Sequence, residues 1–158
     1  MIRIIAVGKC RQKELQACIH EYCKRLTVYT KIEIVEVEEL AAPISNSVAQ
    51  NETVKVQEGK HLFSRIRENE YVILLDLHGK SLTSEGLATK MSEIMTYRTS
   101  DLCFVIGGSL GLSQEMVARA DLRWKLSDLT FPHQLIRLFL VEQIYRAYKI
   151  MRNEPYHK

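Results

Sequence analysis

The sequence predicts an α/β fold in which helices cover both faces of a parallel-rich sheet. Short apolar runs alternate along the chain with stretches whose apolar residues recur at helical spacing. This alternation is typical of a parallel sheet, here of about five strands. A length of 158 residues suits one domain, and no internal repeat or linker divides the chain. We therefore expect a single domain over residues 1–158.

The N-terminal part of the chain is expected to form two strands and a helix. Residues 2–7 are an apolar run that ends at Gly8, and residues 32–37 are rich in isoleucine and valine, which indicates strands. Between them lies an amphipathic helix with Lys24 and Arg25 in its last turn. Its apolar stripe comprises Leu15, Cys18, Ile19, Tyr22 and Leu26.

A loop or flap is expected over residues 38–51, which contain Pro43 and the polar sequence Ser-Asn-Ser. A weaker helical pattern, interrupted by Gly59, follows at Val56, Leu62, Phe63 and Ile66.

The middle of the chain predicts a third strand and another helix. Residues 71–75 are strongly apolar and end at Asp76, after which residues 77–80 turn the chain. Thr83 or Ser84 caps the following helix. The buried stripe of that helix comprises Leu87, Met91, Ile94 and Met95.

A glycine-rich turn after the next strand indicates a ligand site. The strand at residues 102–106 is followed by Gly107, Gly108 and Gly111, by a short helix that begins at Ser113, and by a strand at residues 122–126. Glycines after a strand let the backbone approach a ligand closely, because they lack Cβ and can adopt positive φ. Open α/β sheets bind ligands at the carboxyl ends of their strands. We therefore expect a cofactor pocket there, walled mainly by main chain.

The last helix, from about His133 to Arg152, is apolar over much more than one stripe. Its apolar residues are Leu135, Ile136, Leu138, Phe139, Leu140, Val141, Ile144, Tyr145, Ala147, Tyr148, Ile150 and Met151. Such a helix is buried either within the fold or against a second subunit, and we expect a homodimer through residues 135–151. Glu142 and Arg146 lie four residues apart and are expected to pair.

Composition and charge narrow the class of protein. No apolar run reaches the roughly 18 residues of a membrane span, and the N-terminus lacks the layout of a signal peptide, so a cytoplasmic protein is expected. The four cysteines show neither metal-ligand spacing nor a disulfide pattern, which predicts free, mostly buried thiols and no metal site. Residues 119–158 carry eight Lys/Arg against four Asp/Glu, whereas residues 1–118 carry fourteen against fifteen. Positive charge therefore concentrates beside the expected pocket, either to dock a phosphate backbone or as a solvated helix face.

An ordered set of seven motifs runs along the chain. The motifs are AVGK (6–9), LDLHGK (75–80), SEGLA (84–88), VIGGSLGL (105–112), LSDLTFPHQLIR (126–137), EQIYRA (142–147) and PYHK (155–158). Together they resemble the RlmH-type ribosomal RNA methyltransferases of the SPOUT class, small bacterial enzymes that methylate N3 of a pseudouridine in 23S rRNA. The resemblance implies a deep trefoil knot at the C-terminal side of the sheet, a homodimer, and S-adenosylmethionine held in the knot.

The resemblance also implies which residues bind the cofactor. They are Leu75, Gly107 and the loop residues Leu126, Ser127, Asp128, Leu129, Thr130 and Phe131. Backbone groups of a tight loop can bind the adenine edge while apolar side chains enclose its faces. Plain core packing is the alternative explanation for Leu75 and Leu126. Leu110 departs from the more polar residue expected within the glycine turn.

Tyr156 and His157 match the Tyr-His pair that the family carries near its active site, whereas a frayed chain end is the other explanation. We expect Tyr156 to stack on an extruded base, and His157 to orient that base or to help remove its N3 proton. Arg137 and Arg146 are candidates to hold phosphates or to lower the pKa of the substrate. Glu142 or a bound water is the other candidate for the base.

Two other classes of protein stay open at this point. A Rossmann-type nicotinamide or nucleotide enzyme is disfavoured, because the glycine turn comes late, reads GGxxG and lacks an acidic residue about 20 residues further on. A non-catalytic RNA-binding or ribosome-assembly factor would not need the pocket loops.

Overall fold

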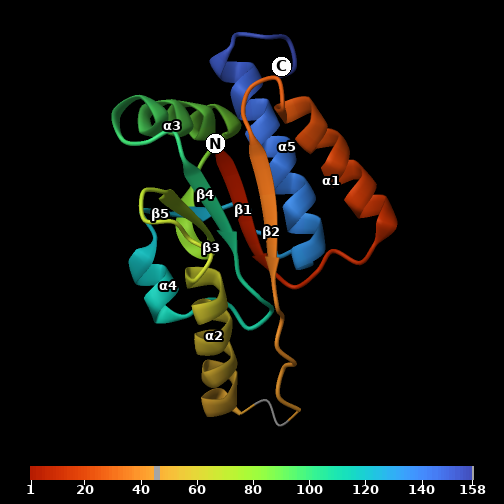
Figure 1. Ribbon diagram of the computed structural model, residues 1–158, viewed down its shortest axis with the longest axis vertical. Coiled ribbons are helices and arrows are strands. Elements are labelled where there is room, and N and C mark those ends of the chain that lie inside the picture. Colours follow the sequence, from red (N-terminus) through yellow and green to blue (C-terminus); the bar gives the residue numbers. More distant parts are fainter. Residues whose placement is uncertain (45–46, 158) are drawn as a thin grey trace.

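The computed structural model describes residues 1–44 and 47–157 (Figure 1). Ser45 and Asn46 of the predicted loop, and Lys158 of the PYHK motif, lie outside the described residues. In the described part, strands and helices alternate along the chain, as the sequence predicts.

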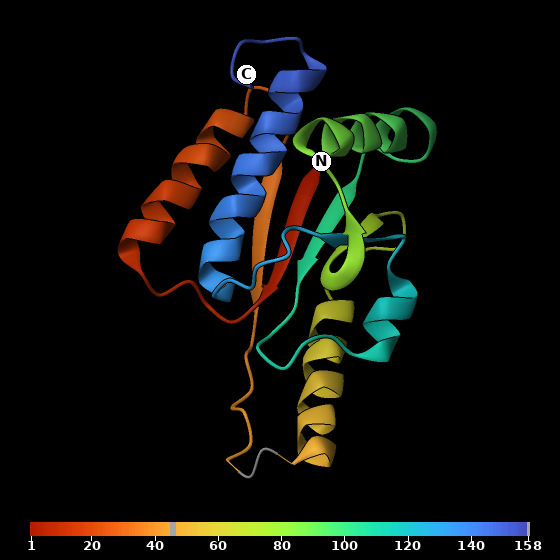
Figure 2. The same ribbon diagram turned by 180° about the vertical axis from the view of Figure 1, so that it is seen from behind.

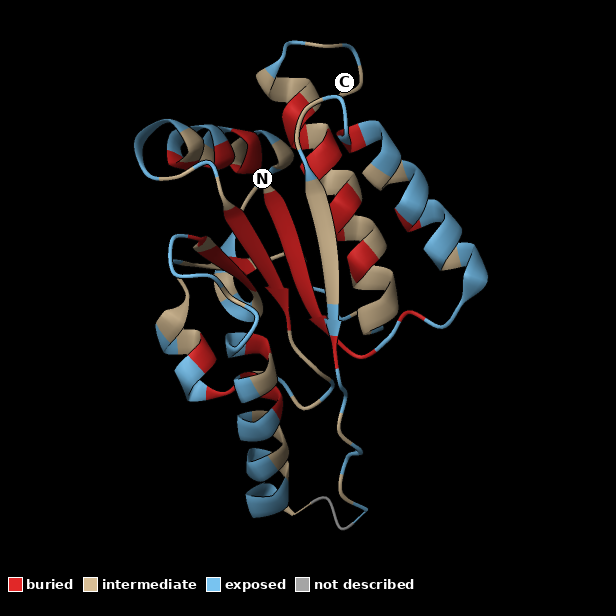
Figure 3. Cartoon of the chain, in the orientation of Figure 1, coloured by how far each residue is buried: buried red, intermediate tan, exposed pale blue. Residues whose placement is uncertain are grey.

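The strands form one parallel sheet in the order β2-β1-β4-β3-β5. They are β1 (Ile2–Val7), β2 (Ile32–Val37), β3 (Tyr71–Ser81), β4 (Leu102–Ile106) and β5 (Leu122–Lys125). The central strands β1 and β4 are buried along their whole length (Figure 3). The predicted α/β class is therefore confirmed, and the trefoil knot stays a prediction from the resemblance.

Helices cover both faces of the sheet (Figures 1 and 2). They are α1 (Lys13–Leu26), α2 (Val48–Phe63), α3 (Ser84–Tyr97), α4 (Gln114–Arg119) and α5 (His133–Met151). Because side chains alternate along a strand, Ile4 and Phe104 pack in a core with α1, α3 and α5, whereas Ile5 and Val105 pack in a second core with α2 and α4.

Two of the helices begin at caps that the sequence indicates. The Thr83 hydroxyl accepts a hydrogen bond from the N–H of Gly86 at 3.0 Å, so Thr83, and not Ser84, caps α3. The Ser113 hydroxyl accepts one from the N–H of Met116 at 3.2 Å and begins α4. Each cap satisfies a backbone donor that has no partner within the helix.

Helix α2 is longer than its sequence pattern suggests. It begins at Val48, so the predicted loop over residues 38–51 is shorter than expected. Gly59 lies inside α2, where a Cβ would collide with the Ser113 side chain. The glycine that weakens the helical pattern therefore permits close packing of α2 against the start of α4.

Strand β3 extends past the turn predicted at residues 77–80. Leu75 and Lys80 both pair with Trp124 of β5, so residues 76–79 bulge out of the ladder between them. The chain does leave the sheet at the predicted position, but it returns to the same neighbouring strand.

Helix α5 packs against α1 and α3 of its own chain. Its buried residues are Arg137, Leu140, Val141, Ile144, Tyr145, Ala147 and Tyr148. The fold thus encloses more of α5 than the sequence-based argument for a dimer assumed. Leu135 and Phe139, near the start of the helix, stay half-buried.

The cysteines differ from one another in exposure. Cys10 and Cys103 are buried, Cys23 is half-buried and Cys18 is exposed, and all four are free. Cys18 was expected in the buried apolar stripe of the first helix, and this expectation is wrong because Cys18 faces solvent on α1. Over residues 1–44 and 47–157, no cluster of His, Cys, Asp and Glu is arranged to hold a metal ion. None of the described helices is both long and apolar enough to cross a membrane.

Candidate functional site

A pocket of about 480 Å³ lies where β3, β4 and β5 end. Its walls come from the β3 bulge, the glycine turn after β4 and the loop after β5, together with residues of α2, α4 and α5. Seven of the eight predicted cofactor residues line it: Leu75, Gly107, Leu126, Ser127, Leu129, Thr130 and Phe131. Asp128 is the exception, because its side chain is 87% exposed and pairs with Lys125 Nζ at 2.6 Å.

The glycine turn is a tight main-chain loop, as predicted. The N–H of Gly111 donates to the carbonyl of Gly108 at 3.1 Å, and Gly111 adopts a φ of +95°, which side chains rarely allow. A Cβ at Gly107 would lie 2.7 Å from Leu112 Cδ2. The turn therefore brings backbone to the pocket surface, since a side chain has no room at Gly107 and is disfavoured by the backbone conformation at Gly111.

An ion pair at the pocket wall was not singled out from the sequence. Arg123 Nε donates to Asp76 Oδ2 at 2.6 Å, and the N–H of His78 donates to Asp76 Oδ1 at 2.9 Å. The available signal was an acidic residue directly after a buried strand, at the edge where the glycine turn lies. Lys55 of α2 also lines the pocket, and nothing local in the sequence indicates that α2 reaches this edge.

A second hollow, of about 400 Å³, shares a wall with the pocket. Leu126, Ser127 and Phe131 line both cavities. The far walls of the second hollow include Ser84 at the start of α3 and Glu142 of α5. The loop after β5 therefore stands between the predicted cofactor site and one of the predicted catalytic residues.

Four of the five predicted catalytic residues form one connected network. Arg146 donates to Glu142 Oε1 through Nε at 3.0 Å and through Nη2 at 2.6 Å, which confirms the predicted pair. The Tyr156 hydroxyl donates to the same oxygen at 3.1 Å. The Arg146 guanidinium lies over the Tyr156 ring, 4.8 Å from its centroid.

His157 joins this network through both ring nitrogens. Nδ1 lies 3.1 Å from Arg146 Nη1, and Nε2 lies 2.6 Å from Glu85 Oε1 on α3. Because a guanidinium can only donate, Nδ1 accepts, and the proton on Nε2 is donated to Glu85. The backbone N–H of Glu85 and the His157 ring hold the pKa of the Glu85 carboxyl below its usual value. In this arrangement His157 has no free lone pair with which to accept a substrate proton.

The last described residues are docked against the fold. The Tyr156 ring packs edge-on against Tyr145, with centroids 4.9 Å apart. Burial and the hydrogen bonds that it shares with Tyr22 and Glu142 raise the pKa of the Tyr156 phenol, which keeps its proton near neutral pH. Glu154 accepts from Lys149 Nζ at 2.6 Å. The explanation of a frayed chain end is therefore wrong for residues 153–157.

Arg137 lies apart from this network. Its side chain is buried, with 1% of the residue exposed. Nη1 donates to Glu36 Oε1 at 2.6 Å, and Nη2 donates to the carbonyls of Val7 and Gly8 at 2.8 and 2.6 Å. The expectation that Arg137 holds phosphates is corrected accordingly, because the guanidinium ties α5 to the ends of β1 and β2 and does not reach the surface.

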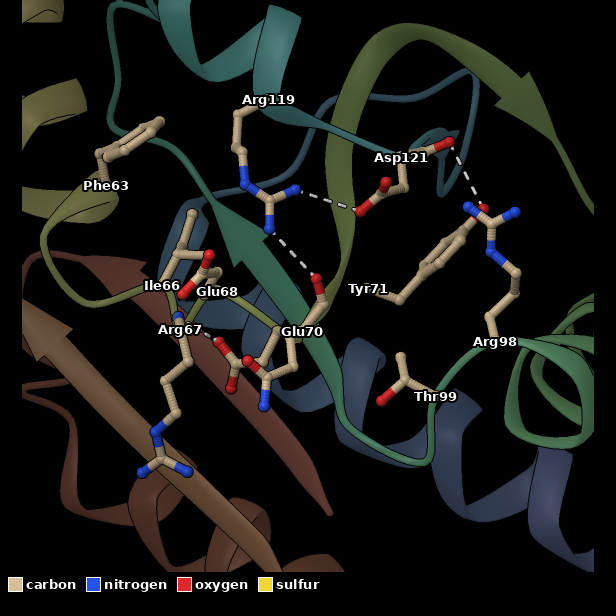
Figure 4. Close-up of a pocket in the computed structure, with 11 residues that line it drawn as sticks. Phe63, Ile66, Arg67, Glu68, Glu70, Tyr71, Arg98, Thr99, Arg119 and Asp121 are labelled. Carbon is tan, nitrogen blue, oxygen red and sulfur yellow. Dashed lines mark hydrogen bonds and ion pairs between the residues drawn. The ribbon is translucent and has the colours of Figure 1, made fainter.

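A larger hollow, of about 760 Å³, lies at the opposite edge of the sheet, where the strands begin (Figure 4). None of the predicted site residues lines it. Arg119 donates there to Asp121 Oδ2 at 3.2 Å and to the carbonyl of Glu70 at 3.1 Å. Among the basic residues after position 118, Arg123 lines the pocket, whereas Arg119 lies at the opposite edge and Lys149 pairs with Glu154. The positive charge is therefore spread over the described fold and is not concentrated at the pocket as expected.

Comparison with known proteins agrees with this geometry. A family model described as "Predicted SPOUT methyltransferase" matches residues 1–157. Proteins named ribosomal RNA large subunit methyltransferase H, from Clostridioides difficile and Ruminiclostridium cellulolyticum, are 51% and 50% identical over 157 residues, with 99% of each chain covered. A solved structure of a probable methylase family protein from Haemophilus influenzae aligns with a TM-score of 0.51 at 12% identity, which supports the fold alone. That alignment covers 96% of this chain and 66% of the other. The chain belongs to the SPOUT methyltransferase family.

Proposed function

We propose that this protein transfers a methyl group from S-adenosylmethionine to N3 of a pseudouridine in the 23S rRNA of the large ribosomal subunit, in the cytoplasm. The names of relatives that are about 50% identical over nearly their full length support this substrate class. The observation that carries the proposal is the wall of Leu126, Ser127 and Phe131, which has a glycine-lined pocket on one side and a hollow with Glu142 on the other.

The pocket residues fit S-adenosylmethionine. A volume of about 480 Å³ lies within the usual range for small-molecule sites. The main chain of residues 126–131 offers donors and acceptors for the adenine edge, and Leu75, Leu126 and Phe131 offer apolar surface for its faces. The sulfonium of the bound donor supplies a methyl group that is already activated for transfer.

Proton removal from N3 is the step that needs a protein group. Transfer forms an N3–CH₃ bond and breaks the S–CH₃ bond, so the donor leaves as a thioether and the N3 proton must go to a base. Among the described contacts, Glu142 Oε2 accepts one hydrogen bond, from Gln143 Nε2 at 2.7 Å. We assign proton acceptance to Glu142, and Arg146 and Tyr156 orient its carboxylate. Because the Arg146 guanidinium covers one face of the Tyr156 ring, a target base stacks on the other face or displaces the guanidinium.

We further propose that the enzyme is a homodimer. Partly exposed apolar side chains lie at the pocket and at the start of α5. Leu129 lines the pocket and is 68% exposed, Phe139 lines the neighbouring hollow, and Leu135 is half-buried one turn before Phe139. The rings of Phe131 and Phe139 meet edge to face at 5.0 Å. A second subunit on this surface would cover the apolar side chains and extend the RNA-binding face beyond what one small domain offers.

Transfer of a labelled methyl group to ribosomes from cells that lack this activity tests the function. We expect the label in 3-methylpseudouridine of 23S rRNA after digestion and mass spectrometry. Label in another nucleoside would contradict the assigned target. Binding to ribosomes without any transfer would indicate a non-catalytic assembly factor instead.

A further inference from the structure

A buried carboxyl group beside the pocket has one oxygen without a partner. Glu58 of α2 is 3% exposed, and its Oε1 accepts from the N–H of Leu40 at 3.0 Å. Its Oε2 is buried and has no hydrogen-bond partner among the described residues. Burial raises the pKa of this carboxyl, against the opposing effect of the Leu40 N–H. A buried polar atom left unpaired costs free energy, so a natural structure that keeps one calls for an explanation.

The unpaired oxygen lies against the glycine turn. Gly108 lines the pocket, and a Cβ on Gly108 would collide with Glu58 Oε2. The carboxyl group therefore occupies the space that a side chain at position 108 would take. Lys55 lies three residues earlier on α2, lines the same pocket and pairs with Glu52 at 2.5 Å. Because an ammonium has three N–H donors, Lys55 can bind a second carboxylate beside Glu52. Helix α2 thus places Lys55 at the pocket and the Glu58 carboxyl directly behind the Gly108 backbone.

Asp76 is the acidic residue that lines the pocket, but neither of its carboxylate oxygens is without a partner. Arg123 and the N–H of His78 already bind its two oxygens. Glu58 is therefore the buried carboxyl behind this wall whose Oε2 has no partner among the described residues. The oxygen is closed off behind Gly108, so a ligand in the pocket reaches it only when the Glu58 side chain or the glycine turn shifts.

We propose that Glu58 binds the α-ammonium group of the amino-acid part of the methyl donor, and that Lys55 binds the α-carboxylate. This inference rests on the proposed use of S-adenosylmethionine. Charge-assisted hydrogen bonds to an ammonium are about twice as strong as neutral ones and would satisfy the unpaired oxygen. The absence of a side chain at Gly108 is what lets the two groups meet. The pocket would then distinguish the complete donor from a nucleoside that lacks the amino acid.

Calorimetric titration with two product-like ligands tests the proposal. S-adenosylhomocysteine carries the amino-acid part, and 5′-methylthioadenosine lacks it. We expect Glu58→Gln to weaken S-adenosylhomocysteine binding by about tenfold or more, as for the loss of one charge-assisted contact, and to leave 5′-methylthioadenosine binding unchanged. Lys55→Gln should show the same selectivity. Glu115→Gln, which alters an exposed carboxyl of α4, is the matched control and should change neither affinity.

Each of the other possible titration results has a different meaning. Equal weakening of both ligands would mean that Glu58 only shapes the glycine turn, and unchanged binding of both would remove it from the site; either result overturns the proposal. Wild-type protein that binds neither ligand would instead refute the proposed cofactor. If Glu58→Gln does not fold, Glu58→Asp, which keeps the charge but withdraws the oxygen, should lose selectivity in the same direction.

Discussion

The position of Gly107 makes the pocket sensitive to a single added side chain. Its Cβ would lie 2.7 Å from Leu112 Cδ2, and its φ is not in the left-handed region, which Gly111 adopts instead. We predict that Gly107→Val abolishes S-adenosylmethionine binding in a folded protein, because the added methyl groups displace Leu112 within the pocket wall. Calorimetry and circular dichroism measure the two quantities. Unchanged affinity would remove Gly107 from the site.

Gly111→Ala is the contrasting variant, because it strains the backbone without filling the pocket wall. A Cβ there meets no atom within 4 Å, but the φ of +95° is strained for alanine. This variant should lose about 1–2 kcal/mol of stability and keep its donor site open.

Both ring nitrogens of His157 are hydrogen-bonded, which changes which variant we expect to lose the most activity. Glu142→Gln keeps the shape of the side chain but removes the base, so we predict a fall in single-turnover transfer of roughly 100-fold or more at unchanged donor affinity. His157→Ala should cost less, because Glu85 and Arg146 already occupy that ring. A larger loss for His157→Ala would return the proton-acceptor role to the histidine.

The buried carboxyl of Glu58 also predicts a pH dependence of stability. Burial raises its pKa above the unfolded value near 4.5, so the folded state binds this proton more tightly than the unfolded state. Its contribution to stability is therefore fully present below the unfolded pKa and is lost as pH rises through the folded pKa. Urea unfolding between pH 4 and 7 should show that Glu58→Gln removes this decline. Parallel pH profiles for the two proteins would contradict the raised pKa.

At the scale of elements, the docked tail predicts a larger effect of truncation than the polar sequence suggests. Removal of residues 153–158 exposes the surface that the Tyr156 ring covers on Tyr145. We expect a loss of about 1–3 kcal/mol of unfolding free energy, nearly intact donor affinity and no methyl transfer. Tyr156→Phe is the matched control, because it keeps the ring and loses the bond to Glu142. Full activity of the truncated protein would exclude the tail from the site.

The sequence predicted elements where one local signal decides the outcome. Apolar runs gave the five strands, and Thr83 and Ser113 gave two helix starts, because strand burial and capping are local properties. The β3 bulge was missed, because it depends on two pairings with Trp124 from another part of the chain. The same neighbouring strand explains Gly79, because a Cβ at that position would lie 2.6 Å from the Arg123 carbonyl.

The residues of the candidate site also fall into two groups, those that a local motif predicts and those that tertiary packing places. Motifs after successive strands brought seven predicted residues to one pocket, since parallel strands end at the same edge. The packing of α2, which no local pattern encodes, brings Lys55 to the pocket and Glu58 to the back of the glycine turn. Arg137 was misjudged, because its burial depends on the ends of β1 and β2.

At the scale of the whole molecule, the partly exposed apolar side chains at the start of α5 predict the assembly. Leu135 is half-buried and belongs to neither described core, so Leu135→Glu should leave the fold intact while placing a charge on the proposed dimer surface. We expect the wild-type protein to sediment as a dimer at micromolar concentration and the variant as a monomer. Thr89→Glu, at an exposed position on α3, is the control and should not alter the dimer. A wild-type monomer would refute the assembly.

The strand order also determines when the proposed donor site can form during synthesis. Ile2 pairs with Ile32 on one side and with Leu102 on the other, so one edge of β1 waits for a strand made some hundred residues later. At translation rates of about 5–20 residues per second, the delay between β2 and β4 is on the order of 3–14 s. Over that interval the nascent chain exposes an open, apolar strand edge, which is a template for wrong pairing and a target for chaperones. Arrival of β4 closes that edge and also delivers the glycine turn.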